Sequence, residues 1–83
     1  MEITKVDINR EEKGNCKGLA RVTIDDCFVI HSIRIIDKDG QLFVAMPSKM
    51  VQEGVWMDVC HPIKKETREM FTNAILDAYR KQV

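Results

Sequence analysis

The sequence lacks any long apolar run. No stretch approaches the ~20 consecutive apolar residues that a membrane-spanning helix needs. The first residues also lack the basic-then-apolar layout of a signal peptide. These absences predict a cytoplasmic protein that does not enter a membrane.

Cysteine is scarce, and its number is odd. Cys16, Cys27 and Cys60 are widely spaced, and three cysteines cannot form a complete disulfide framework. Neither a CxxC nor an HxxxH motif occurs, so a zinc site has little support. We expect reduced thiols buried in strand-like segments, with no metal and no other cofactor.

An excess of one charge is also missing. Thirteen Lys and Arg residues balance thirteen Asp and Glu residues, which gives a formal net charge of +0. This balance excludes a polycation that coats nucleic acid but allows a local basic patch. A chain of 83 residues that is 45% hydrophobic and 31% charged is typical of one globular domain, which we expect to span residues 1–83.

The pattern over the first two-thirds of the chain predicts short β-strands. Short β-rich runs are separated by turn signals at Asp25-Asp26, at residues 37–40 and at Glu53-Gly54. We expect residues 10–15 to form a loop and Pro47 to end a strand. The predicted antiparallel sheet has about five strands, at residues 3–8, 19–24, 27–36, 41–46 and 55–60.

The last quarter of the chain has helical periodicity. Apolar residues recur at spacings of three and four between residues 64 and 81. Glu66 near the start and Arg80-Lys81 at the end suit the helix dipole. The predicted stripe contains Thr67, Met70, Phe71, Ala74, Ile75, Ala78 and Tyr79. The fold class is therefore α+β, an antiparallel sheet followed by one C-terminal amphipathic helix.

The predicted strand at residues 27–36 is apolar at both odd and even positions. Phe28 and Ile30 have one parity, and Val29, Ile33 and Ile35 have the other. A strand that is apolar on both faces needs cover on both. The helix can cover one face, and a second subunit is the simplest source of the other cover, so we expect a homodimer.

Residues suited to catalysis are few and do not form a set. Cys60 and His61 are neighbours in a predicted strand, so their side chains would diverge. His61 could bond the start of the helix or a phosphate there, and a structural cap is the simpler interpretation. Asp25-Asp26 is explained by a turn. We therefore predict no enzymatic activity and no small-molecule substrate.

Basic residues offer the best candidate site. Lys64, Lys65 and Arg68 cluster where the helix begins, and backbone N–H groups there also attract phosphate. Lys49 follows Pro47 in a predicted loop. These four cations are the candidate nucleic-acid-binding residues. The alternative is a solvated helix face.

Two aromatic residues could add to such a site. Trp56 and Phe43 could stack on bases, although aromatic residues are more often found in cores or interfaces. Met46, Met50 and Met57 fall around the same loop and its flanking strands, where methionines often fill soft interfaces.

Four segments resemble one known family. Residues 42–49, LFVAMPSK, look like the signature of the bacterial SpoVG family, the stage V sporulation protein G family. Residues 28–37 resemble its FVVHDIRVIDG, residues 58–63 its DIAHPI, and residues 1–6 the start of its MEVTDVR. The order and spacing match over essentially the whole chain.

The resemblance implies a homodimeric, non-enzymatic bacterial regulator of septation and sporulation that binds DNA or RNA. Lys49 and Arg68 match basic residues of the family pattern. The other matching motif residues are Arg34, Phe43, Met46, Pro47, Ser48, His61 and Pro62. The sequence departs from the pattern at Met50 and Met57, where the family has arginine, so two positive charges are missing.

Two functions follow from these observations. The first is a dimeric regulator that binds DNA or RNA mainly through phosphate contacts. The second is an adaptor in septation that binds proteins and not nucleic acid, favoured by the neutral net charge and by Met50, Trp56 and Met57.

Overall fold

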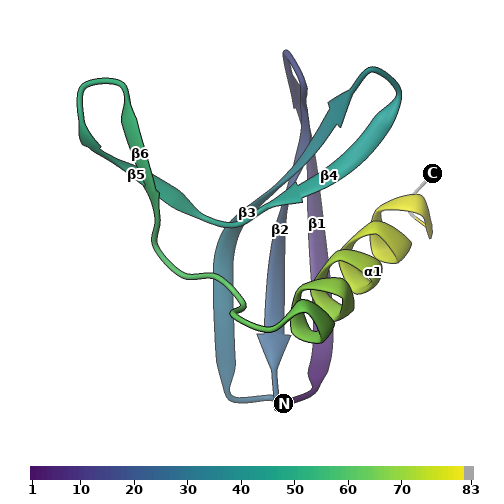
Figure 1. Cartoon of the computed structure of the whole chain (residues 1–83). Helices are drawn as coiled ribbons and strands as arrows, with labels where there is room; N and C mark the ends of the chain where they lie inside the picture. The colour runs from purple at the N-terminus through teal and green to yellow at the C-terminus, as the bar shows by residue number, and fades with distance from the viewer. Residues whose placement is uncertain (82–83) are drawn as a thin grey trace.

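The computed structural model describes residues 1–81, which form six strands and one helix (Figure 1). The elements are β1 (Ile3–Lys13), β2 (Cys16–Ile24), β3 (Phe28–Lys38), β4 (Gln41–Ala45), β5 (Ser48–Gln52), β6 (Val55–Asp58) and α1 (Lys65–Lys81). Strands β1 to β4 form one antiparallel sheet in that order, and β5 pairs only with β6 in a second sheet. The predicted α+β class is confirmed.

The turn at Asp25-Asp26 is also confirmed. Both residues have positive φ, 51° and 54°, as the two central residues of a type I′ turn require, and the Cys27 N–H closes this turn on the Ile24 carbonyl at 3.0 Å. The Asp25 N–H donates to the carbonyl of Glu2 at 2.8 Å, and the Asp26 N–H donates to Thr4 Oγ1 at 3.0 Å. The two aspartates therefore have a structural role in this turn, and their N–H groups bind it to the start of the chain.

Two predicted loops are wrong. Residues 10–15 are not a loop, because β1 continues to Lys13, which pairs with Cys16 across a turn at Gly14-Asn15. Pro47 follows the end of β4, as predicted, but the expected loop after it is instead strand β5, so Lys49 lies on a strand.

The core lies between one face of the four-stranded sheet and α1. The helix crosses this face and contacts β1 and β4 (Figure 1). The buried residues are Ala20, Val22, Ile24, Ile33, Ile35, Met46, Phe71, Ile75 and Leu76. Leu76 extends the predicted helical stripe.

A β-bulge in β3 changes which face its apolar residues occupy, so the prediction of a strand that is apolar on both faces is wrong. Ala20 pairs with Ile33 while Val22 pairs with Ile30, so His31 and Ser32 both lie opposite one residue of β2. The extra residue reverses the parity of the strand. Ile30 and Ile33 therefore both face the core, and the opposite face does not need the cover that we predicted.

The C-terminal end of α1 is tied to β1 by one arginine. Arg10 Nη2 donates to the carbonyl of Tyr79 at 2.8 Å, and its guanidinium lies 4.0 Å from the centroid of the Tyr79 ring. A cation at this position also suits the negative end of the helix dipole. The helix is thus fixed to the sheet at its far end.

The β5–β6 hairpin is a separate feature, which we call the arm (residues 48–58). The remainder, β1 to β4 with α1, is called the body. The arm projects away from the body (Figure 1). Every strand residue of the arm after Ser48 is exposed. The arm therefore has no core of its own.

Candidate nucleic-acid interface

Three of the four predicted cations lie together at the start of α1. The carbonyl of Lys64 accepts the Arg68 N–H at 3.0 Å, which places Lys64 at the helix boundary. Lys65 and Arg68 are three residues apart and so lie on one side of the first turn. All three side chains are exposed, and within residues 1–81 none of them forms an ion pair.

This arrangement suits an anion. The first turn of a helix has backbone N–H groups without helical partners and carries the positive end of the dipole. Exposed cations beside it add mobile positive charge, while Glu66 in the same turn reduces the net field. Arg68 also has a structural contact, because its Nη2 donates to the carbonyl of Pro62 at 3.4 Å. We call Lys64, Lys65 and Arg68 the basic patch.

Lys49 lies elsewhere. It is on β5 of the arm, where its Cα partner is Met57 on β6. The arm projects away from the start of α1 (Figure 1). The four predicted cations therefore do not form a single site, because the segment that carries Lys49 is a strand of the arm.

The motif residues around Pro47 form the base of the arm. Met46 is buried in the core. The carbonyl of Pro47 accepts the Val59 N–H at 2.7 Å, and Ser48 Oγ accepts from Arg34 Nη2 at 3.4 Å. These contacts give the motif a structural role, which is to join the arm to β3 and to the segment that leads into α1.

Both aromatic candidates are exposed. Phe43 is 44% exposed, and its neighbours Leu42 and Val44 pack against the core, so Phe43 lies on the open face of the sheet. Trp56 is 61% exposed and lies on the arm. Neither residue belongs to the core of the chain.

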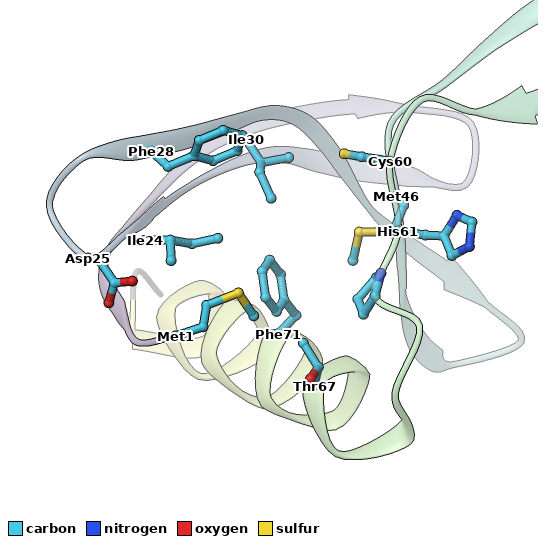
Figure 2. A pocket seen from close by; sticks show the side chains of 11 residues that line it. Met1, Ile24, Asp25, Phe28, Ile30, Met46, Cys60, His61, Thr67 and Phe71 are labelled. Atoms are coloured by element: carbon cyan, nitrogen blue, oxygen red, sulfur yellow. The ribbon is translucent and has the colours of Figure 1, made fainter.

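An apolar groove lies between the body and the segment at residues 60–62, and it was not predicted from the sequence. Its volume is about 340 Å³. Phe71, Met1 and Ile30 line its interior, whereas the ring of His61 points away from it (Figure 2). The lining residues are Met1, Ile24, Asp25, Phe28, Ile30, Met46, Cys60, His61, Pro62, Thr67 and Phe71. They come from segments far apart in the chain, so no local pattern marks the groove.

His61 has a different contact from the predicted cap. Its Nδ1 lies 3.8 Å from Asp58 Oδ2, and both side chains are about half exposed. A pair this exposed contributes little to stability. His61 and Pro62 together form part of the groove wall.

A second hollow, of about 410 Å³, lies on the open face of the sheet beside the bulge. Arg21 Nη2 donates to Asp7 Oδ2 at 3.1 Å there, and His31 and Ser32 form the bulged edge. Ser32 has a φ of 65°, a conformation that is strained for serine. In the sequence, the switch of apolar residues from even positions (Ile30) to odd positions (Ile33) was the signal that could have indicated this bulge.

The described residues contain no metal-binding group. Residues 1–81 hold no group of three or more His, Cys, Asp or Glu side chains that could bind a metal ion. The cysteines are free, as predicted, but Cys27 and Cys60 are exposed and Cys16 is half-buried, so the predicted burial is wrong. Among these residues no helix has the length and apolar character to cross a membrane.

Comparison with known proteins agrees with the resemblance noted from the motifs. The SpoVG family model matches residues 1–81. A relative from Treponema denticola, named "Putative septation protein SpoVG", is 43% identical over 82 residues, covering 98% of this chain and 88% of its own. A relative of the same name from Clostridium beijerinckii is 44% identical over 84 residues and covers 100% and 92%. A SpoVG 1 protein from Listeria monocytogenes is 49% identical over 80 residues and covers 95% and 78%.

Proposed function

This chain belongs to the SpoVG family, and we propose that it is a non-enzymatic, cytoplasmic regulator of septation that binds DNA or RNA as a homodimer. The names of its relatives support the role in septation. The observation that carries nucleic-acid binding is the basic patch, three exposed cations without ion pairs at the start of α1.

Phosphate contact would supply most of the binding energy. Each neutralised phosphate contributes about −0.9 to the slope of log K against log salt for duplex DNA, and about −0.7 for a single strand. Phosphate contacts position a protein but carry little sequence information. We therefore expect modest base specificity and strong salt dependence.

Fluorescence anisotropy with labelled DNA and RNA, as duplexes and single strands across a salt series, tests this function. The variant K64A/K65A/R68A should weaken binding more than about 10-fold on every sequence and reduce the salt slope by up to about 2.7 per chain. The control K13A/K17A/K38A removes the same formal charge near the hairpin turns and should have a smaller effect. Unchanged affinity in the first variant would exclude the basic patch as the binding site. No binding by the wild type at low salt would exclude nucleic-acid binding altogether.

A protein-binding adaptor is the second candidate, and the arm favours it. Met50, Trp56 and Met57 are each more than half exposed on the arm. The family pattern noted in the sequence has arginine at positions 50 and 57, so the two methionines make this arm more apolar than that pattern. Specific capture of one septation protein by the wild type but not by W56K, from a nuclease-treated lysate, would support the adaptor.

The proposed homodimer now has a different basis. Because of the bulge, β3 no longer requires a second subunit to cover its other face. The arm, however, leaves large apolar side chains exposed that a second subunit could cover. Light scattering after size-exclusion chromatography should give about twice the 9.6 kDa chain mass. A single-chain mass at a protein concentration on the order of 100 μM would contradict the dimer.

A further inference from the structure

We propose that the two copies of the dimer exchange arms, and that Trp56 of each arm binds in the apolar groove of the other copy. This inference rests on the proposed homodimer and specifies its contact surface. It does not depend on nucleic-acid binding.

The arm needs a surface to pack against. A two-stranded hairpin alone is marginally stable in water. Its strands pair only with each other, and its side chains beyond Ser48 are exposed. The large apolar residues on the arm and just after it are Met50, Val51, Val55, Trp56, Met57 and Val59, each between 45% and 62% exposed. Such a cluster is typical of an interaction surface.

The groove is a suitable receptor for an aromatic side chain. An apolar cavity of about 150 Å³ is large enough to bind benzene. The groove has a volume of about 340 Å³, and Ile30, Met46 and Phe71 give it an apolar lining (Figure 2). Phe28 and Met1 at this site are 61% and 66% exposed, so they too would gain cover from an occupant.

The surface area of the chain fits a missing subunit. A compact monomer of this mass should expose about 5,100 Å², whereas this chain exposes 5981 Å². The excess of about 900 Å² is close to the ~800 Å² per partner that a standard interface buries. The radius of gyration, 12.8 Å, also exceeds the ~11.8 Å expected for a compact domain of this length.

A second copy satisfies both surfaces at once. Each chain carries one uncovered arm and one open groove, so a symmetric pair closes with both filled. A different protein that covered only the arm would leave the groove open. The formal net charge of +0 adds no repulsion between copies. The groove wall also includes Pro62, whose carbonyl binds Arg68, so an occupant would contact the segment that leads into the basic patch.

A charge exchange between arm and groove tests the proposal directly. Trp56→Lys places a cation on the arm, and Thr67→Glu places an anion in the groove wall, near a helix start that tolerates acids. Each variant alone should raise the dimer dissociation constant by roughly 100-fold or more, because both symmetric contacts are affected. An equimolar mixture should recover a dimer, since one of its contacts is wild type and the other pairs Lys with Glu.

The controls keep the same charges away from the proposed contact. Gln52→Lys changes an exposed arm residue, and Asn73→Glu changes an exposed residue of α1 outside the groove. Both should remain dimeric. Circular dichroism should show that all four variants fold, because the substituted side chains are not buried in the single chain.

The only tryptophan of the chain provides a second measurement. Emission from Trp56 should shift to shorter wavelength as the protein associates, and K64A/K65A should leave that shift intact, because this variant keeps Arg68 and its bond to Pro62. In the variant Trp56→Cys, a disulfide between position 56 and Cys60 should form between chains on oxidation. A non-reducing gel distinguishes this bond from one within a chain, because only the bond between chains doubles the mass of the band.

The outcomes separate the two proposals. A monomeric wild type would remove the dimer and the arm exchange together. A dimer that survives both charge variants would overturn the arm exchange while the dimer stands. Loss of the dimer in W56K but not in T67E would show that the arm contacts a different surface. A mixture that stays monomeric would exclude reciprocal exchange.

Discussion

The body and the arm use apolar residues in opposite ways. In the body, residues such as Ile33, Ile35 and Ile75 are fully buried between sheet and helix. In the arm, Met50 and Trp56 are Cα partners across the hairpin and both are more than half exposed. One chain therefore contains a region that completes its own core and a region that does not. Mutations in the body should lower the free energy of unfolding at any protein concentration. Mutations in the arm should lower it only where the chain associates.

The largest effect is expected from Ile33→Ala. This side chain is fully buried, so its truncation should lower the free energy of unfolding by about 2–5 kcal/mol. Urea denaturation at a concentration where the chain is monomeric measures this change. Val51→Ala on the arm is the control and should change stability by less than about 0.5 kcal/mol. Equal losses in the two variants would contradict the comparison.

Gly18→Ala should destabilise the body by about 1–3 kcal/mol. A Cβ at Gly18 would lie 2.9 Å from the backbone carbonyl oxygen of Asn9, which belongs to the sheet and cannot move freely. Gly54→Ala in the arm tests backbone strain alone, because its added Cβ would meet no atom within 4 Å. Thermal denaturation of both variants would show whether the close approach matters, and an unchanged midpoint for Gly18→Ala would refute it.

Ser32→Gly should stabilise the body by about 0.5–1 kcal/mol, because glycine adopts positive φ without the steric cost that serine bears. Ser32 has a φ of 65°. Ser32→Ala keeps the strain and should give no gain. The midpoint of chemical denaturation measures both variants, and equal midpoints would mean that the bulge is not strained.

The smallest effect on the isolated chain is expected from Trp56→Ala. Its side chain is 61% exposed, so unfolding of the monomer should change by less than about 0.5 kcal/mol. At high concentration the same variant should lose the stabilisation that association gives the wild type. Denaturation at low and at high concentration separates these contributions. A large loss at low concentration would show that Trp56 packs within its own chain.

Local chemistry predicted much of the body. The residue types at Asp25-Asp26 and Asp39-Gly40 suit positive φ, and the structure has positive φ at all four positions. The helical period of residues 64–81 predicted α1 to within one residue. These features depend on neighbours in sequence, which a single sequence contains.

The features that depend on distant residues were less predictable. Strand β5 was not predicted, because Pro47 was taken to begin a loop. The Val59 N–H, 12 positions away, donates to the Pro47 carbonyl at the base of this strand. The basic patch was found because its three residues are close in sequence. Lys49 was grouped with them because its segment was predicted to be a loop, whereas the structure places it on β5 of the arm. The groove could not be predicted, since no segment contains enough of its lining to form a pattern.

The bulge in β3 has a consequence for how the chain can change length during evolution. Inside a strand, losing one residue normally turns every following side chain to the other face. Here the strand already contains one residue more than its partner. Deleting Ser32 would restore regular pairing and leave Ile30 and Ile33 on the core face. The middle of a core strand, ordinarily the least tolerant place for a deletion, is in this protein a place where one can be accepted.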